Sequence, residues 1–342
     1  MTLTLFIFTI LLSYILSISF ERIFRKFQWF IDTPNSRSSH LSPTPSAGGL
    51  AIIFSYIIYL IGLSFINVID KTTLGVLFII LLPVMLIGLL DDLKETKISL
   101  RLIIQFLSAS FLIYYFQINS NWVPDFIFTQ SSFLIISLSV VLSVWLMNLY
   151  NFMDGIDGYA GTQAVLIFSF AAILAFLNKP EENMYLYLIG FAFANFGFLL
   201  RNWYPAKIFM GDTGSVSIGF VIAFFIFFSA SESIISIYTW LILLSIFISD
   251  ASYTLFVRTV TKNNLTKPHL THGFHILSKN KKSQENVAIY MILFNIFWIL
   301  PLALISNTFI EFHILVTIVA YVPLLFILLK LGAGLEDKFR LN

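Results

Sequence analysis

The chain of 342 residues contains no cysteine, which excludes disulfide bonds and any iron–sulfur or thiol chemistry of its own. Charged residues are also scarce, at 11% of the chain, whereas they make up about a quarter of a soluble domain. The net charge of +2 is too small to indicate nucleic-acid binding. What the chain has instead is 58% hydrophobic and 17% aromatic residues, with a mean hydropathy of +0.90. This composition excludes a soluble globular protein, a disordered chain and a disulfide scaffold, and it predicts a polytopic helical membrane protein.

Long apolar runs recur along the sequence and leave room for about eleven transmembrane helices. The predicted spans are 3–20, 47–68, 73–90, 100–117, 131–149, 159–177, 184–200, 214–230, 233–256, 286–305 and 308–330. Each is expected to be a helix, because a helix satisfies its own backbone hydrogen bonds in lipid. The first run is too long for a signal peptide and lacks a small-residue cleavage site, so we expect it to be retained. With no repeat or linker between the spans, residues 1–342 are predicted to form one all-α membrane domain.

Lysine and arginine residues predict the orientation of these spans. When the loops are assigned alternately to two sides, every Lys and Arg except Lys71 and Lys179 falls on one side. The positive-inside rule makes that side cytoplasmic. The N-terminus is then outside and the C-terminus is cytoplasmic.

Polar segments collect on the same predicted side of the membrane. They cover 32–49, 88–101, 148–158, 207–215 and 267–275. A transporter is expected to hold such groups at the membrane midplane on broken helices. Their position at one face instead favours a site that is supplied from the cytosol.

The pair Asp91 and Asp92 ends an apolar span. Two carboxylates at a helix C-terminus oppose the helix dipole and raise each other's pKa. Nearby cations such as Lys94 and Arg101, or a metal, would relieve this cost. The pair is therefore either a solvated helix end, or a general base or organiser of a phosphate site.

Asn148, Asn151, Asp154 and Asp157 recur at every third position. Neighbours in such a series lie about 60° apart on a helix, so adjacent pairs can share one ligand. Oxygen ligands of this kind suit Mg²⁺ together with phosphate. A polar loop with turn glycines is the alternative, and an EF-hand is excluded because its ligand order and bidentate Glu are absent.

Three further features have both a structural and a functional interpretation. Residues 210–215 (MGDTGS) contain good helix N-capping residues and also resemble a phosphate or metal cradle. The histidines at 269, 272 and 275 are either a solvated loop or donors to an anion. Asp250 lies in or near a span, eight residues before Arg258, and is a functional candidate or part of an ion pair. Gly49, next to Gly48, can simply make a helix start flexible.

Taken together, the segments resemble the polyprenyl-phosphate N-acetylhexosamine-1-phosphate transferase superfamily (glycosyltransferase 4 family, MraY/WecA-like). The pattern N-x-x-N-x-x-D-G-x-D-G at 148–158 is the most specific part, and the aspartate pair and residues 210–215 match further motifs. The segment from Asp250 to His275 is similar to that of the WbpL-type O-antigen initiators. The histidine loop is neither H-H-H nor H-I-H-H, which argues against a muramyl-pentapeptide substrate.

The resemblance implies a reaction in which undecaprenyl phosphate attacks the β-phosphorus of a UDP-N-acetylhexosamine. UMP leaves, and a lipid diphosphosugar forms for O-antigen or another cell-envelope glycan. The cofactor implied is Mg²⁺, with Mn²⁺ as an alternative. The enzyme would be a multi-pass protein of the bacterial inner membrane with its active site facing the cytoplasm. The donor sugar, the lipid length and a homodimeric state are left open.

The resemblance also implies roles for individual residues. Asp91 and Asp92 match the catalytic pair, and Asn151 and Asp212 match metal ligands. The implied substrate-binding residues are Gly49, Arg101, Asn148, Asp154, Asp157, His269 and His272. Arg101 is placed only by its distance of ten residues from Asp91, where the family often has Lys.

Other functions are less consistent with the sequence. An intramembrane aspartyl protease would need a Y-D and a G-x-G-D motif at midplane depth, and neither is found. A CDP-alcohol phosphotransferase also uses D-G motifs, but it would need an Arg and further aspartates at set spacings after Gly158, and this pattern is absent. The alternative of a different class is a polytopic transporter or flippase for lipid-linked sugars, without catalysis.

Overall fold

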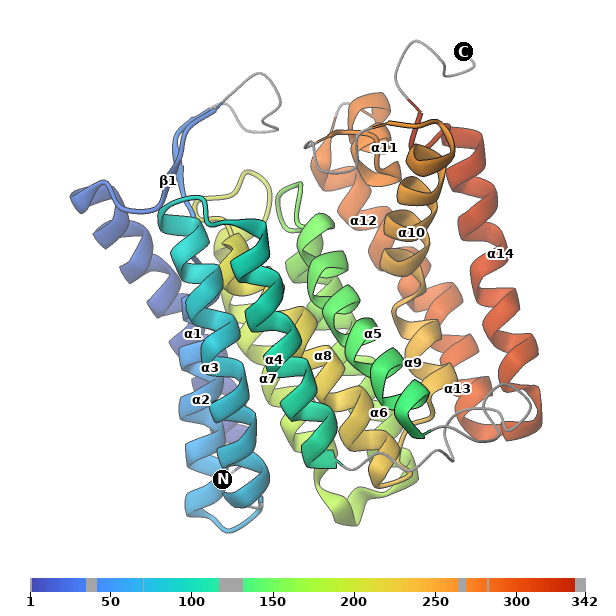
Figure 1. Cartoon of the computed structure of the whole chain (residues 1–342). Coiled ribbons are helices and arrows are strands. Elements are labelled where there is room, and N and C mark those ends of the chain that lie inside the picture. The colour runs from blue at the N-terminus through green and yellow to red at the C-terminus, as the bar shows by residue number, and fades with distance from the viewer. Residues whose placement is uncertain are drawn as a thin grey trace.

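The computed structural model describes residues 2–34, 42–69, 71–116, 132–263, 269–281 and 283–335. Within them the chain is a bundle of helices that run side by side (Figure 1). The helices of the first half are α1 (Thr2–Phe27), α2 (Gly49–Phe65), α3 (Lys71–Leu93), α4 (Ile98–Phe116), α5 (Ser132–Phe152), α6 (Tyr159–Asn178) and α7 (Met184–Asn202). Those of the second half are α8 (Gly211–Ser231), α9 (Ile237–Leu243), α10 (Ser245–Val260), α11 (Gly273–Lys281), α12 (Gln284–Phe294), α13 (Leu300–Thr308) and α14 (His313–Leu331). Three short helical segments join them: η2 (Pro180–Glu182), η3 (Asn295–Ile299) and η4 (Ile310–Phe312).

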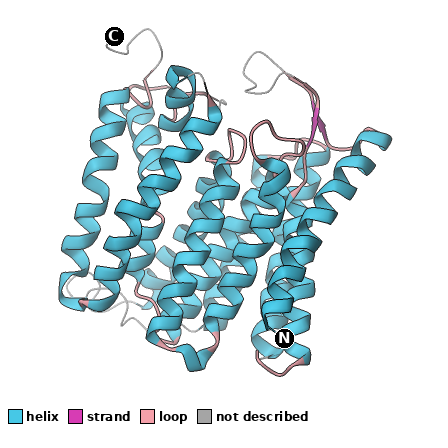
Figure 2. Cartoon of the chain, turned by 180° about the vertical axis from the view of Figure 1, so that it is seen from behind, coloured by secondary structure: helices cyan, strands magenta, loops and turns pink. Residues whose placement is uncertain are grey.

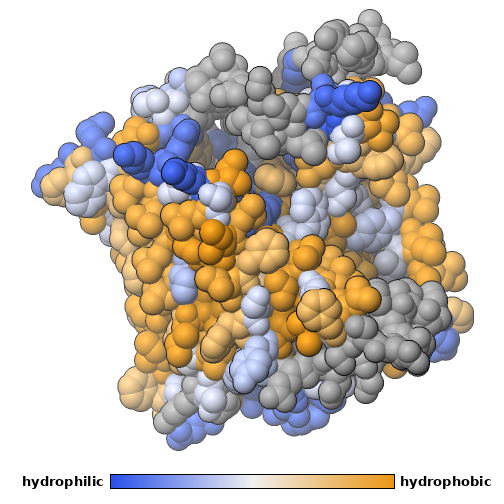
Figure 3. Space-filling view, in the orientation of Figure 1, coloured by the Kyte–Doolittle hydropathy of each residue, from blue (hydrophilic) through white to orange (hydrophobic). Residues whose placement is uncertain are grey.

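Every predicted span coincides with a helix or a helix pair, so the all-α membrane fold is confirmed. In the described residues, nine helical stretches are long and apolar enough to cross a membrane, and a tenth is the bent pair α9–α10. The 17 residues of α2 are at the lower limit for a span. Figure 3 shows a broad apolar band with polar side chains at both ends of the molecule. The start of α1 and the end of α14 lie at opposite ends of the bundle (Figure 1).

Helix α8 forms the centre of the bundle, and α3, α5 and α2 pack around it. In the most apolar stretch of α8, 89% of the residues are buried inside the protein, compared with 17% for α1 and 22% for α14. The outer helices instead expose large apolar side chains such as Leu11 and Phe326, which suits contact with lipid. The first turn of α8 is therefore held by protein on several sides.

Two features of the predicted loops were not anticipated. Residues 31–32 and 44–45 form the antiparallel strands β1 (Ile31–Asp32) and β2 (Thr44–Pro45), which stand at one end of the bundle (Figure 2). The predicted loop after α10 contains the nine-residue helix α11. Residues 35–41 and 264–268, which belong to two of the predicted polar segments, lie outside the described residues.

The span between 237 and 260 is broken at Leu244, where α9 and α10 meet at 76°. The break frees the backbone carbonyl of Leu243, and the side chain of Gln163 donates to it over 3.4 Å. Asn295 in turn donates to Gln163 over 2.9 Å. Gln163 on α6, which is itself held by Asn295 of η3, thus takes the place of a helix hydrogen bond at the break.

Candidate active site

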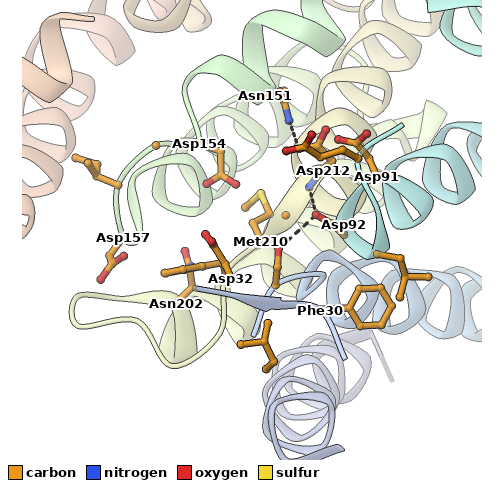
Figure 4. A pocket seen from close by; sticks show the side chains of 18 of the residues that line it. Phe30, Asp32, Asp91, Asp92, Asn151, Asp154, Asp157, Asn202, Met210 and Asp212 are labelled. Atoms are coloured by element: carbon orange, nitrogen blue, oxygen red, sulfur yellow. Dashed lines mark hydrogen bonds between the residues drawn. The ribbon is translucent and has the colours of Figure 1, made fainter. Parts of the chain in front are cut away.

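A cavity of about 690 Å³ lies at the end of the bundle where α3, α5 and α8 approach the two strands (Figure 4). Its size is within the range of small-molecule sites. The acidic side chains in its wall are Asp32, Asp91, Asp92, Glu95, Asp154, Asp157 and Asp212. Lys94, His269 and His275 also line it. The predicted polar segments therefore meet at one end of the bundle.

Arg101 joins two of these carboxylates. Its Nη1 donates to Asp91 Oδ2 over 2.7 Å, and its Nη2 lies 2.5 Å from Asp212 Oδ2. Asp91 Oδ1 accepts from the backbone and the hydroxyl of Thr96 at 2.8 and 2.6 Å. These three charged side chains each keep between 15% and 23% of their surface exposed. Asp91 and Asp212 line the cavity, whereas Arg101 lies behind them and outside its wall. The structure thus places Arg101 in contact with Asp91, which lies ten residues before it in the chain.

Asp92 has a different environment from its neighbour. Its Oδ1 accepts from Asp212 N at 2.9 Å and from Ser46 Oγ at 3.3 Å. Its Oδ2 accepts from the backbone and the hydroxyl of Thr213 at 2.9 and 2.6 Å. Asp92 on α3 therefore caps the N-terminus of α8. The negative charge of Asp92 is stabilised there by the positive end of the α8 dipole. Successive residues on α3 point about 100° apart, which separates the environments of the two aspartates.

Asn151 reaches Asp212 from the end of α5. Its side-chain nitrogen donates to Asp212 Oδ1 over 2.8 Å and to Ser215 Oγ over 3.0 Å. Asn148, one turn earlier, donates to Gln105 Oε1 over 2.7 Å and does not line the cavity. The structure thus brings Asn151 and Asp212 together and directs Asn148 toward α4.

Asp154 and Asp157 follow α5 and differ in their contacts. Asp154 is half-buried, and burial first of all, then the charges of Asp212 and Asp92, raises its pKa to about 8. Asp157 Oδ2 accepts from Ala206 N at 2.9 Å, and Asp157 N donates to Gln284 Oε1 over 2.7 Å. Figure 4 shows Asp154 between Asp157 and the cluster around Asp212. Asp157 therefore ties loops together at the cavity edge.

Two glycines permit the close packing at this site. Gly211 has φ +70°, and a Cβ there would lie 2.5 Å from a carboxylate oxygen of Asp92, so a larger residue would disrupt the cap. At Gly49 a Cβ would overlap the backbone of Gly214, and the Gly49 N–H donates to Met210 O over 2.9 Å. Gly49, a predicted substrate-binding residue, lies at the contact of α2 with α8 and outside the cavity wall.

The three histidines separate into two kinds. His269 and His275 line the cavity, whereas His272 is buried with its Nδ1 3.3 Å from Asp250 Oδ1. Burial is the main cause that lowers the pKa of His269 to about 4 and that of His275 to about 3. Both imidazoles are therefore neutral near pH 7, and each offers one donor and one acceptor. His275 was noted in the sequence only as part of a series of three.

The donor set around Asp212 fits a hard divalent cation. Asp212 Oδ2 makes no well-aligned hydrogen bond within the described residues, and its negative charge is offset by Arg101. No three acidic or histidine side chains of the described residues converge closely enough to hold a metal alone. Mg²⁺ typically uses one or two carboxylates together with water and substrate phosphates. The excess of carboxylates also calls for a cation before a phosphate group can enter.

Comparison with known proteins shows which proteins this chain resembles. The model of glycosyl transferase family 4 matches residues 73–230, which carry every cavity carboxylate except Asp32. A probable undecaprenyl-phosphate N-acetylglucosaminyl 1-phosphate transferase of Bacillus subtilis is 27% identical over 252 residues, covering 72% of this chain and 69% of that protein. A phospho-N-acetylmuramoyl-pentapeptide-transferase of Prochlorococcus marinus is 30% identical over 228 residues, covering 61% and 60%. Another, from Borrelia garinii, is 30% identical over 241 residues, covering 60% and 66%.

Proposed function

We propose that this chain, whose residues 73–230 match the model of glycosyl transferase family 4, transfers a sugar 1-phosphate from a UDP-N-acetylhexosamine to undecaprenyl phosphate. The reaction releases UMP and forms a lipid diphosphosugar. The observation that carries this proposal is a carboxylate-lined cavity at one end of a membrane bundle, in whose wall Asp91 and Asp212 are both paired with Arg101. The transferases named above, from Bacillus subtilis and Prochlorococcus marinus, support the same type of reaction.

Arg101 is the group we assign to the acceptor phosphate. A phosphate monoester has its second pKa near 6 and is mostly a dianion at cytosolic pH. The guanidinium presents a planar set of donors that matches phosphate oxygens. Asp91 fixes this guanidinium from one side, and Thr96 fixes Asp91 from the other. The acceptor oxygen is then positioned for attack on the β-phosphorus of the donor.

Bond formation to the β-phosphorus breaks its bond to the oxygen that leaves with UMP. Phosphoryl transfer of this kind depends mainly on positioning and charge neutralisation. Because the acceptor is already ionised, a general base contributes less than usual. We therefore assign Asp91 to orienting Arg101 and the acceptor, and Asp92 to holding the first turn of α8 in place.

Asp212 and Asn151 are the side chains we assign to the metal, with Mg²⁺ as the ion and Mn²⁺ as an alternative. When bound, the cation would neutralise the donor pyrophosphate. Asp92 holds the backbone of Asp212, and Asn151 orients its carboxylate, so the ligand is preorganised. Asp154 and Asp157 are assigned to the nucleotide side of the cavity and His269 to the sugar-phosphate side.

The setting that we propose is the bacterial inner membrane, with the cavity facing the cytoplasm. The Lys and Arg distribution supports this orientation. The product would serve O-antigen or another cell-envelope glycan.

UMP release tests the proposal against a transporter or flippase. Membranes that contain the protein are mixed with undecaprenyl phosphate, Mg²⁺ and one UDP-N-acetyl sugar at a time, and UMP is measured. We expect release that requires both the lipid and the metal. A transporter would release no UMP with any donor, and that result would reject the transferase.

A further inference from the structure

Asp250 on α10 is a buried carboxylate that lies outside the cavity wall. Both of its oxygens accept hydrogen bonds, as those of Asp92 do. Its Oδ1 accepts from Gly273 N at 2.8 Å and its Oδ2 accepts from Phe274 N at 3.0 Å. The hydroxyl of Thr254 donates to Oδ1 over 3.2 Å. Asp250 therefore caps the first turn of α11 from another helix.

The same carboxylate also fixes the ring of His272. The imidazole Nδ1 lies 3.3 Å from Asp250 Oδ1, and only 4% of the residue is exposed. Both partners are buried, so little solvent competes for this contact. His272 is thus held at one end of the capped turn.

From His272 a stack of rings leads to the cavity and to the core. On one side its ring lies 5.0 Å from that of His269, at an angle of 26°. On the other side it lies 5.7 Å from Phe274, which is 5.1 Å from Tyr159. Tyr159 in turn lies 5.4 Å from Phe247 on α10. A ring in the cavity wall is therefore connected through stacked rings to the buried core.

His275 depends on the same helix turn. Its ring centre lies 4.0 Å from that of Phe274, and a Cβ on Gly155 would come within 2.6 Å of its Cε1 atom. The imidazole is held between Phe274 and the backbone after α5. A shift of the first turn of α11 would therefore displace His275 as well as His269.

We infer that Asp250 is a positioning residue for the sugar-nucleotide donor: by capping α11 and fixing His272, it sets His269 and His275 in the cavity wall. Asp250 itself does not touch the donor. The part of the inference that concerns the donor rests on the proposed function, whereas the positioning of the two rings does not.

The kinetic test is Asp250→Asn, which keeps the shape but places an amide nitrogen against the N–H groups of α11. We expect the KM for UDP-N-acetylglucosamine, or for whichever donor is active, to rise about tenfold or more, since small misplacements of a binding group have effects of this size. The KM for undecaprenyl phosphate should stay within about twofold, because Arg101 is not involved. A fall in kcat with both KM values unchanged would indicate a purely structural role and overturn the inference.

Two further variants and a control sharpen this test. His272→Phe keeps a stacking ring but removes the contact with Asp250, so a smaller rise in the donor KM is expected. Gly155→Ala displaces His275 directly and should raise the donor KM while leaving the cap of α11 intact. The control is Glu285→Gln, which removes an exposed carboxylate from the first turn of the next helix, α12, and should change neither KM.

Imidazole NMR tests the positioning without any activity. The chain has five histidines, and single His→Gln variants assign their signals in labelled protein. In Asp250→Asn the signals of His269 and His275 should move together with that of His272. The signal of His313, whose Nδ1 lies 3.0 Å from Oγ of Ser236 at the N-cap of α9, should keep its position. Movement of the His272 signal alone would overturn the inference. If no UDP-sugar released UMP in the wild type, the proposed function would fail while this measurement still decided the positioning.

Discussion

Helices α8 and α11 begin in the same way but present different chemistry to the cavity. In each, a carboxylate from a neighbouring helix accepts from two consecutive backbone N–H groups. Asp92 binds the start of α8 at 2.9 and 2.9 Å, and Asp250 binds the start of α11 at 2.8 and 3.0 Å. The free N–H groups and the dipole of a helix N-terminus explain why an acidic residue occupies both places.

The difference lies in what each capped turn carries. The first turn of α8 holds Asp212 beside Arg101, so that end of the cavity is charged. The turn at α11 holds His269 and His275, whose pKa values of about 4 and about 3 keep them neutral near pH 7. The same cap thus supports a charged end suited to phosphates and metal, and an end where two neutral imidazoles can each donate and accept a hydrogen bond.

Removal of Asp212 is expected to have the largest effect on this contrast. In Asp212→Ala the backbone can keep its cap, but the carboxylate beside Arg101 and Asn151 is lost. We expect Mg²⁺-dependent UMP release to fall by about 1000-fold or more, as for other preorganised electrostatic groups. UMP release at saturating donor, acceptor and Mg²⁺ measures this.

The control for that variant is Glu232→Ala, at the other end of α8. Glu232 is exposed and follows the last turn of α8, whereas Asp212 lies in the first turn, so the variant should be as active as the wild type. Near-normal turnover of Asp212→Ala would remove Asp212 from the metal site. The first turn of α8 would then no longer differ from that of α11 by holding a metal ligand.

Substitutions in the aspartate pair should reduce activity less than Asp212→Ala does, and the two members should affect different kinetic constants. Asp92→Asn weakens the cap of α8, and we expect about a 100-fold loss of turnover through displacement of Asp212. Asp91→Asn leaves that cap intact but loosens Arg101, so the KM for undecaprenyl phosphate should rise. Steady-state kinetics with each substrate varied in turn separates the two.

A pH–rate profile of Asp91→Asn, with the enzyme saturated, tests whether deprotonation is the main role of this residue. We expect activity to stay low as the pH rises, because orientation of Arg101 is not restored by hydroxide. Full recovery at high pH would make Asp91 a general base and contradict the positioning role.

The spans and the meeting of the polar segments could be predicted because they depend on local composition. An apolar run of span length must form a helix in lipid, and the loops of one predicted side meet at one end of the bundle. The break at Leu244 was not predicted, because neither Pro nor Gly marks it and its partner Gln163 lies on another helix. Helix α11 was missed for a similar reason, since its cap comes from Asp250 in α10.

Roles within the motifs depend on partners that are remote in sequence. A spacing of three among the histidines does not reveal that Asp250 holds His272 and leaves His269 and His275 in the cavity wall. Likewise, the aspartate pair looks uniform in sequence, although Thr213 binds one member and Arg101 the other. Sequence patterns identify the residues that gather at a site, whereas contacts between helices decide which of them face the ligand.

The smallest expected effect concerns Asp154, which lies at the charged end. In the protein alone its pKa is about 8, so the group is mostly protonated at pH 7. A bound cation favours the ionised form, and below its pKa the proton must therefore be displaced. We expect the Mg²⁺ concentration for half-maximal UMP release to fall by up to about tenfold between about pH 7 and about pH 8, and to level off above.

Asp154→Asn should flatten this dependence while the histidine end stays unchanged, because His269 and His275 do not titrate in this range. A slope that persisted in Asp154→Asn would assign the proton to another group, and the contrast between a titrating acidic end and a neutral end would no longer rest on Asp154.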